Sequence, residues 1–353
     1  MSYQDGWAAI NLEMPARVPH TEYSVTTHWG VIEAVTGIKA GPESSQVKKQ
    51  RAGRALERAW DFDFAWSTLI SHGELGEYYT DMGHAVYAAG GVDWRIPRAS
   101  PHFQTPEDVL RFDPWESLGQ KDLGELKARF EEAYARNARN NPNQVNMTGV
   151  YITMISGMIG LFGWDLLLLA AGTDPVAFGE VANRYARWIQ QYYDALGAAD
   201  LPMVMVHDDI VWSAGPFISP KWYREYIFPN YKKLFAPLVE SGKKIAFTSD
   251  GNYTMFIDDI AACGISGFVM EPTTDMGYIA ERYGRTHFFI GNADTRILLG
   301  GDKAAIRAEV ERCMSIGKRC PGYFLAVGNH IPPNTPVDAV LYYQQVYEEL
   351  CKR

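Results

Sequence analysis

The fold is indicated first by the stretch MVMVHDDI at residues 203–210, which joins an apolar run to a polar end. Val204, Met205 and Val206 show no alternation of polar and apolar residues, which is typical of a parallel strand buried on both faces. A helical pattern of apolar residues follows at residues 220–241. We therefore interpret this part of the chain as a buried parallel strand, a polar loop and a helix.

Seven further apolar runs alternate with helical patterns along the chain. The runs lie at residues 62–69, 92–96, 147–153, 244–250, 267–271, 287–292 and 323–328, of which 92–96 is the weakest. The helical patterns lie at residues 44–59, 175–196, 220–241, 302–316 and 336–350. Periodicity alone also fits a doubly wound sheet, but eight strands alternating with helices favour an α/β fold of the (β/α)8 TIM barrel type. We divide the chain into an N-terminal helical extension, residues 1–59, that packs on the barrel, and a catalytic barrel at residues 60–353.

Composition narrows the function classes. The chain has 353 residues, 47% of them hydrophobic, which is enough for a large core. Its net charge of -9 lacks the basic excess expected of a general nucleic-acid binder. We see no signal peptide, and the apolar stretch near residues 154–171 is interrupted by glycines and Asp165, so we expect a buried helix and no membrane span. No nucleotide-binding glycine motif, GxSxG or HExxH is present. These features favour a cytoplasmic enzyme.

Polar side chains follow five consecutive predicted strands. The strand ends read His207-Asp208-Asp209, Thr248-Ser249-Asp250, Glu271-Pro272, Asn292-Ala293-Asp294 and Asn329-His330. In a TIM barrel these ends meet at one mouth, where the working residues lie. We expect a polar cluster of Asp209, Asp250, Glu271 and His330, supported by His207, Asn292, Asp294 and Asn329.

Two explanations of this cluster stay open. Several carboxylates are costly to bury together unless a cation or a shared proton compensates their charge. For the metal, we expect Glu271, Asp250, His330 and Asp294 as ligands. Asp294 precedes a helical pattern, and is interpreted equally well as a helix N-cap.

The cysteines are placed away from this mouth. Cys263 precedes the sixth predicted strand and Cys320 precedes the eighth, while Cys313 lies in a helix and Cys351 in the C-terminal tail. A thiolate-rich site is therefore not expected. A metal here would be held by oxygen and nitrogen ligands, which still suit zinc.

Aromatic residues near the same strand ends are candidates for a substrate pocket. Trp212 and Phe217 follow the fourth strand, and Tyr151 lies at the end of the third. With His207 and Asn292 they form our predicted substrate-binding set. His84 is interpreted either as a core histidine or as a mouth residue.

Two segments carry a resemblance to a known family. The segment at residues 208–229, DDIVWSAGPFISPKWYREYIFP, and the segment GNHIPPNTP at residues 328–336 resemble the fourth-strand region and the closing motif of the uroporphyrinogen decarboxylase-like superfamily. The resemblance covers roughly residues 60–350, and residues 80–94 add to it. It implies a (β/α)8 barrel that is a porphyrinogen decarboxylase or a corrinoid-dependent methyltransferase. The latter group includes the methyltransferases that begin aryl methyl ether O-demethylation.

Departures from the family patterns separate these activities. The Arg-rich segment with which the decarboxylases grip their acidic substrate has no match, since Arg51-Ala52-Gly53-Arg54 lies in a helical pattern. The methylcobamide:thiol methyltransferases bind zinc with a His-x-Cys and a further Cys. Thr248, Asp250 and Asn329 stand at the corresponding positions here. The resemblance therefore favours a substrate other than a thiol.

We expect a methyltransferase that moves a methyl group from a small methylated donor, a methoxylated aromatic, to the cobalt of a corrinoid protein. Asp209, Asp250, His330 and Asn329 are the predicted catalytic residues. An oxygen-ligated cation such as zinc, or a general acid, would make the ether oxygen a better leaving group. The alternatives are a decarboxylase, a methylcobamide:thiol methyltransferase, and a barrel without catalysis. The expected partner is a corrinoid-binding protein, with no nucleic acid or membrane, and a homodimer is a further hypothesis.

Overall fold

The computed structural model describes residues 2–67, 69–80 and 102–353. The strand predicted at residues 92–96, His84, and most of the resembling segment at residues 80–94 lie outside these residues. The other predicted strands can be compared with the structure.

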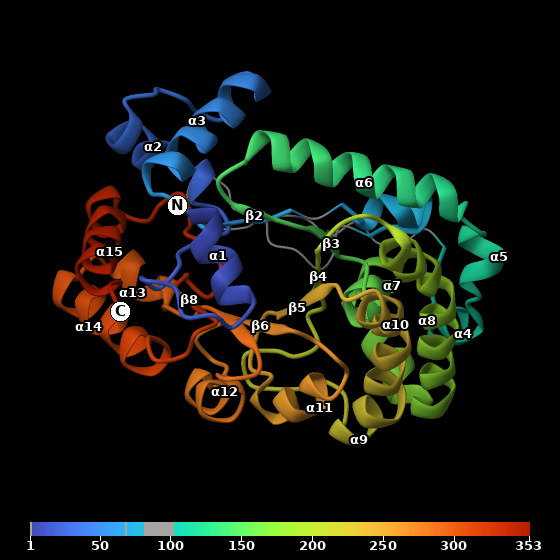
Figure 1. Cartoon of the computed structure of the whole chain (residues 1–353). Coiled ribbons are helices and arrows are strands. Elements are labelled where there is room, and N and C mark those ends of the chain that lie inside the picture. Colours follow the sequence, from blue (N-terminus) through green and yellow to red (C-terminus); the bar gives the residue numbers. More distant parts are fainter. Residues whose placement is uncertain (1, 68, 81–101) are drawn as a thin grey trace.

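Parallel strands form the centre of the molecule (Figure 1). A six-stranded sheet runs in the order β3-β4-β5-β6-β7-β8, and β1 pairs in parallel with β2. The strands are β1 (Phe64–Ala65), β2 (Val145–Asn146), β3 (Thr148–Val150), β4 (Met203–His207), β5 (Lys244–Ser249), β6 (Gly267–Met270), β7 (Phe288–Ile290) and β8 (Tyr323–Phe324). The run predicted at residues 147–153 is therefore shifted toward its N-terminal side and divided at Met147.

The N-terminal segment closes the sheet into a barrel. The backbone N–H of Leu325, just after β8, donates to the carbonyl of Pro19, and the N–H of Thr21 donates back to Leu325. On the other side of this segment, the N–H of Asp63 donates to the carbonyl of His20. Residues 19–21 therefore lie between β8 and β1 and contribute backbone to the barrel wall. The boundary at residue 59 between extension and barrel stays a prediction.

Helices surround the strands, as the alternating pattern predicts (Figure 1). Predicted and observed bounds agree closely for α3 (Gln46–Ala59), α8 (Pro175–Ala198), α14 (Lys303–Gly317) and α15 (Val337–Leu350). The helix predicted at residues 220–241 is α9 (Pro220–Trp222), a π-helical turn (Tyr223–Ile227) and α10 (Phe228–Glu240). The remaining α-helices are α1 (Ser2–Ile10), α2 (Trp29–Thr36), α4 (Pro106–Arg111), α5 (Pro114–Leu118), α6 (Leu123–Asn140), α7 (Met154–Thr173), α11 (Ile257–Ala261), α12 (Met276–Tyr283) and α13 (Thr295–Gly300).

Helix α7 is the apolar stretch expected to be a buried helix. It is long and apolar enough to cross a membrane by length and composition alone, but 72% of its apolar window is buried inside the protein. The helical conformation is interrupted at Gly163, where φ is 74°. Burial of this kind is what the core helix of a folded domain requires, so the expectation of a buried helix is confirmed.

The barrel interior is filled by alternate strand residues. Met203 and Met205 of β4 belong to an inner apolar cluster, whereas Val204 and Val206 pack outward against the helices. Helix α1 covers the end at which the strands begin. A Cβ atom at Gly6 of α1 would lie 2.7 Å from the carbonyl oxygen of Asp63, just before β1, so only glycine allows this close packing.

Candidate active site

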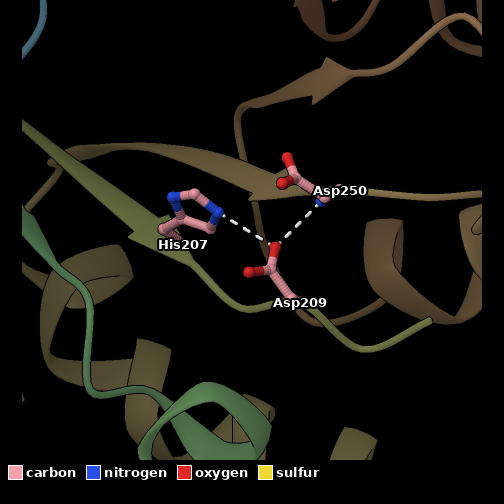
Figure 2. A group of neighbouring side chains, drawn as sticks. All are labelled: His207, Asp209 and Asp250. Carbon is pink, nitrogen blue, oxygen red and sulfur yellow. Dashed lines mark hydrogen bonds and ion pairs between the residues drawn. The ribbon is translucent and has the colours of Figure 1, made fainter. Parts of the chain in front are cut away.

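The ends of β4 and β5 bring three titratable side chains together (Figure 2). His207 is the last residue of β4, Asp209 follows two residues later, and Asp250 follows β5. The Nε2 atom of His207 lies 3.0 Å from Oδ1 of Asp209, and the backbone N–H of Asp250 donates to the same oxygen at 3.0 Å. One ligand atom from each of the three side chains can be chosen so that all lie within 4.8 Å of one another. We call these residues the acidic trio.

Electrostatics within the trio favour protonated forms. Burial acts to lower the pKa of His207, but the nearby carboxylates of Asp209, Asp250 and Asp208 outweigh it and raise the pKa to about 9. Burial raises the pKa of Asp250 to about 8, and the charge of Asp209 adds to this shift. Two carboxylates this close therefore compensate their charge by keeping protons, or by binding a cation.

Asp208 is directed away from the trio and has a structural role. Its carboxylate accepts hydrogen bonds from the backbone N–H groups of Ile155 and Ser156 in the first turn of α7, at 3.1 and 2.6 Å. It also accepts one from the hydroxyl of Tyr231 at 2.5 Å. The Ser156 hydroxyl accepts from the N–H of Asp209 at 2.9 Å, which fixes the loop that carries the trio.

Glu271 joins the ends of β5, β6 and β8. One carboxylate oxygen accepts from the backbone N–H of Gly251 at 2.7 Å, and the other accepts from the side-chain amide of Asn329. The Asn329 carbonyl oxygen then accepts from the N–H of His330 at 2.7 Å. Glu271 is therefore committed to holding these loops, although its charge also contributes to the raised pKa of Asp250.

His330 lies at the same mouth, beside aromatic rings that sequence analysis did not assign to the site. Burial and the charge of His207 lower the pKa of His330, so its imidazole is neutral at pH 7. Its ring centroid is 6.5 Å from that of Tyr23, which stacks on Trp66 at 3.9 Å. Tyr23 was missed because it follows the wall segment at residues 19–21, which has too few apolar residues to be recognised as a strand.

Trp212 and Phe217, which the sequence assigns to a pocket wall, lie in an aromatic cluster with Trp164, and their contact with a substrate stays a prediction. Trp164, Trp212 and Phe217 form three ring pairs with centroid distances of 5.1–5.8 Å. Trp212 is 49% exposed, so one ring of the cluster faces solvent. The Tyr151 ring, also assigned to the pocket from the sequence, lies 4.3 Å from that of His207 between ring centroids.

Two predicted site residues have other roles. Asp294 is the N-cap of α13, where it accepts from the N–H of Arg296 at 2.9 Å and pairs with the Arg296 guanidinium at 2.6 Å. These bonds give Asp294 a structural role at the start of α13, and its assignment as a metal ligand stays a prediction. Asn292 is buried, and its amide donates to two backbone carbonyls and accepts from Arg312 at 3.0 Å. These bonds hold Asn292 within the protein, and its assignment to substrate binding stays a prediction.

Comparisons with known proteins identify the family. The family described as Uroporphyrinogen decarboxylase (URO-D) matches residues 75–350. The chain belongs to this family. It is 29% identical over 320 residues to the uroporphyrinogen decarboxylase of Bordetella petrii, covering 83% of this chain and 84% of that protein. It is 26% identical over 176 residues to the decarboxylase of Carboxydothermus hydrogenoformans, covering 50% of this chain and 49% of that protein.

A solved structure confirms the fold predicted for a uroporphyrinogen decarboxylase-like protein. A methyltransferase from Methanosarcina mazei matches with a TM-score of 0.64 and 16% identity, covering 99% of this chain and 98% of that chain. Identity this low supports the TIM-barrel fold alone. The resemblance seen in the sequence to this superfamily is confirmed, and the roles of individual site residues stay predictions.

Among residues 2–67, 69–80 and 102–353, the acidic trio is a group whose donors could hold a metal ion. One imidazole nitrogen and two carboxylates are donors that Zn²⁺ and other divalent cations accept. Of the predicted ligands, only Asp250 belongs to the trio. His207 and Asp209 were assigned to substrate binding and catalysis, because a sequence does not reveal which side chains at a strand end point toward one another.

The four cysteines are all buried. The thiol of Cys263 lies 3.5 Å from the carbonyl oxygen of Phe228, and burial raises its pKa to about 12. Cys320 lies just before β8, at the end of the barrel opposite the trio. The expectation that the thiols are remote from the mouth is therefore confirmed for both residues.

Proposed function

We propose that this protein transfers a methyl group from a methoxylated aromatic to the cobalt of a corrinoid carried by a partner protein. The proposal rests mainly on the acidic trio, which lies near both an aromatic cluster and His330. A methoxyarene has a flat ring that aromatic side chains bind well, and an ether oxygen that must be activated before the methyl group leaves. The described groups at this mouth match both needs.

The ether oxygen gains negative charge as the methyl group leaves it, and this charge must be compensated. Phenolate is a better leaving group than an alkoxide, because its conjugate acid has a pKa near ~10, as tyrosine does. Even so, an aryl ether is inert until the charge that develops on its oxygen is neutralised. His207, Asp209 and Asp250 would hold a divalent cation, which would supply Lewis-acid polarisation of that oxygen. His330 lies beside the trio as a neutral donor that could hold the same oxygen.

Asp209 has a positioning role in this proposal. Its Oδ1 accepts hydrogen bonds from His207 and from the Asp250 backbone, so it sets the distance between the two neighbouring side chains. Trp212, Phe217 and Tyr151 would orient the aromatic ring. We also retain, as predictions, a location in the cytoplasm and a homodimer.

The decarboxylase activity of the curated relatives is the second candidate, since the family match favours it. Its acidic substrate would require positive charge at the mouth, whereas the trio supplies carboxylates. A thiol acceptor is disfavoured because oxygen and nitrogen donors stand where the thiol-activating enzymes have cysteines.

The experiment compares the two activities directly. The purified chain is incubated with cob(I)alamin and a panel of methoxyarenes, and methylcobalamin and the free phenol are measured. The same preparation is tested for decarboxylation of uroporphyrinogen. We expect methylcobalamin and phenol in equal amounts and no decarboxylation. Decarboxylation without methyl transfer would refute the proposal, and transfer from methylthiols or methylamines alone would refute the ether assignment only.

A further inference from the structure

A cleft lies between α3 and the loop from α6 to β2, at the end of the barrel opposite the acidic trio. Its volume is about 520 Å³. Its lining includes Phe62, two residues before β1, and Gln144, directly before β2. The cleft therefore lies where the strands begin, whereas the acidic trio lies where β4 and β5 end.

Three arginines converge on this cleft from two helices. Arg54 and Arg58 come from α3, and Arg139 comes from the last turn of α6. Among the described residues, none of the three guanidinium groups makes an ion pair or a hydrogen bond. The helix dipole favours a positive charge in the last turn of a helix. This explains the position of Arg58 in α3 and, separately, that of Arg139 in α6. The dipole does not explain why Arg54, four residues before Arg58, lines the same cleft.

A buried amide in the lining also lacks a partner. Gln144 is only 5% exposed, and its Nε2 group has no hydrogen-bond partner within the part of the chain that the structure describes. The loop before it is held in place, because the Asn146 amide donates to the carbonyls of Asn141 and Gln144 at 2.9 Å each. The Nε2 atom is itself covered by the protein, so Gln144 supports the floor of the cleft and does not present this group to it.

We propose that this cleft binds a small organic anion through a phosphate or carboxylate group, held by Arg54, Arg58 and Arg139. Guanidinium groups bind such oxyanions with paired, charge-assisted hydrogen bonds. The volume is within the range typical of small-molecule sites. This site is independent of the function proposed for the mouth.

An adjoining hollow offers room for the organic part of the ligand. It has a volume of about 460 Å³ and shares Arg54, Glu57 and Asn141 with the arginine cleft. Trp29 lines it and presents a partly buried ring. The two hollows therefore adjoin at these three shared residues, and Lys49 adds a further positive charge to the second hollow.

The protonation state of Glu57 should make anion binding in this cleft depend on pH. Burial raises its pKa to about 7, against the opposing effect of Arg54 and Arg58. The charged groups that line the cleft with it are Arg54, Arg58, Arg139 and Asp61, and the Asp61 carboxylate accepts a hydrogen bond from Arg17. A charged Glu57 competes with an anion for the arginines, so binding should strengthen as pH falls through neutrality.

Binding is tested on the full chain by calorimetric titration with ribose 5-phosphate and with citrate. We expect saturable binding of one of them, weakened about tenfold or more in Arg54→Gln and in Arg139→Gln, as for loss of a charged hydrogen bond. Saturation by the sugar phosphate assigns a phosphate, and saturation by citrate assigns a carboxylate. Arg136→Gln is the matched control, because Arg136 is an exposed residue of the same helix that pairs with Glu132. Melting temperatures of all variants verify that they are folded.

The pH arm uses sulfate, which takes up no proton near neutrality. Sulfate should bind more tightly at pH 6 than at pH 8.5 in the wild type, and equally at both values in Glu57→Gln. The proposal is overturned if neither organic anion saturates the protein at millimolar concentration. It is also overturned if Arg136→Gln weakens binding as much as the cleft variants do.

Discussion

The Nε2 atom of His207, the last residue of β4, lies 3.0 Å from Oδ1 of Asp209, which follows two residues later. Residues two apart in an extended segment point to the same side, which brings the imidazole and the carboxylate together. The same carboxylate oxygen accepts the backbone N–H of Asp250 from the neighbouring strand. One oxygen atom therefore connects two strands and organises the mouth of the barrel.

Metal binding should depend on the trio. We expect Asp209→Asn and Asp250→Asn to lose a bound divalent cation, because a neutral amide is a much weaker ligand than a carboxylate. Metal content after dialysis against Zn²⁺ measures this. Asp294→Asn is the control, since asparagine also caps helices and Asp294 lies outside the trio. Retention of metal by both trio variants would contradict the assignment.

Methyl transfer should fall when charge compensation at the leaving oxygen is removed. We expect Asp250→Asn and His330→Ala to lower the rate of methylcobalamin formation by about 10²–10³, the usual cost of losing one such group. Binding of the aromatic ring should survive, because Trp212 and Phe217 are unchanged. Wild-type rates in both variants would show that neither residue takes part.

The adjacent carboxylates Asp208 and Asp209 should behave in opposite ways. Asp208→Ala leaves two buried N–H groups of α7 and the Tyr231 hydroxyl without an acceptor, so we expect a loss of stability of about 3 kcal/mol or more. Asp209→Ala should affect activity far more than stability. Chemical denaturation and the methyl-transfer assay, applied to both variants, measure the contrast. Equal loss of stability would argue against a purely structural role for Asp208.

The cysteines should be dispensable for the chemistry. Cys263→Ser and Cys320→Ser change buried thiols at a distance from the mouth, so we expect methyl transfer and metal content close to wild type. The assay is turnover at a temperature well below the melting point, since a buried serine costs some stability. Loss of bound metal from Cys320→Ser alone would place a thiol in the site after all.

Stability should depend on pH through Glu57. A carboxyl group whose pKa is raised on folding binds its proton more tightly in the folded state, so stability falls as pH rises from about 4.5 to about 7. Glu57→Gln removes this cost, and should raise stability at pH 8 by about 1–3 kcal/mol after allowance for partial exposure. At pH 4 the variant and the wild type should be alike. Thermal unfolding at both pH values is the measurement, and equal stability at pH 8 would contradict the burial argument.

Much of the fold could be predicted because its signals are local. The runs at β4, β5, β6 and β7 are apolar on both faces, and helices such as α8 and α15 carry their own periodicity. Barrel closure by residues 19–21 could not be predicted. That segment, with His20 and Thr21, has no strand pattern of its own, and is held by long-range hydrogen bonds to Leu325 and Asp63.

The candidate site also has some features that local sequence predicts and others that depend on long-range contacts. The sequence alone determined that acids, amides and imidazoles end successive strands, since covalent order places each one directly after an apolar run. Only the tertiary structure decided which of them meet. His207, Asp209 and Asp250 face one another, Asp208 turns to cap α7, and Asp294 caps α13. The physical reason is that a carboxylate takes whichever donors the packed chain brings within reach, and those donors lie up to tens of residues away in sequence.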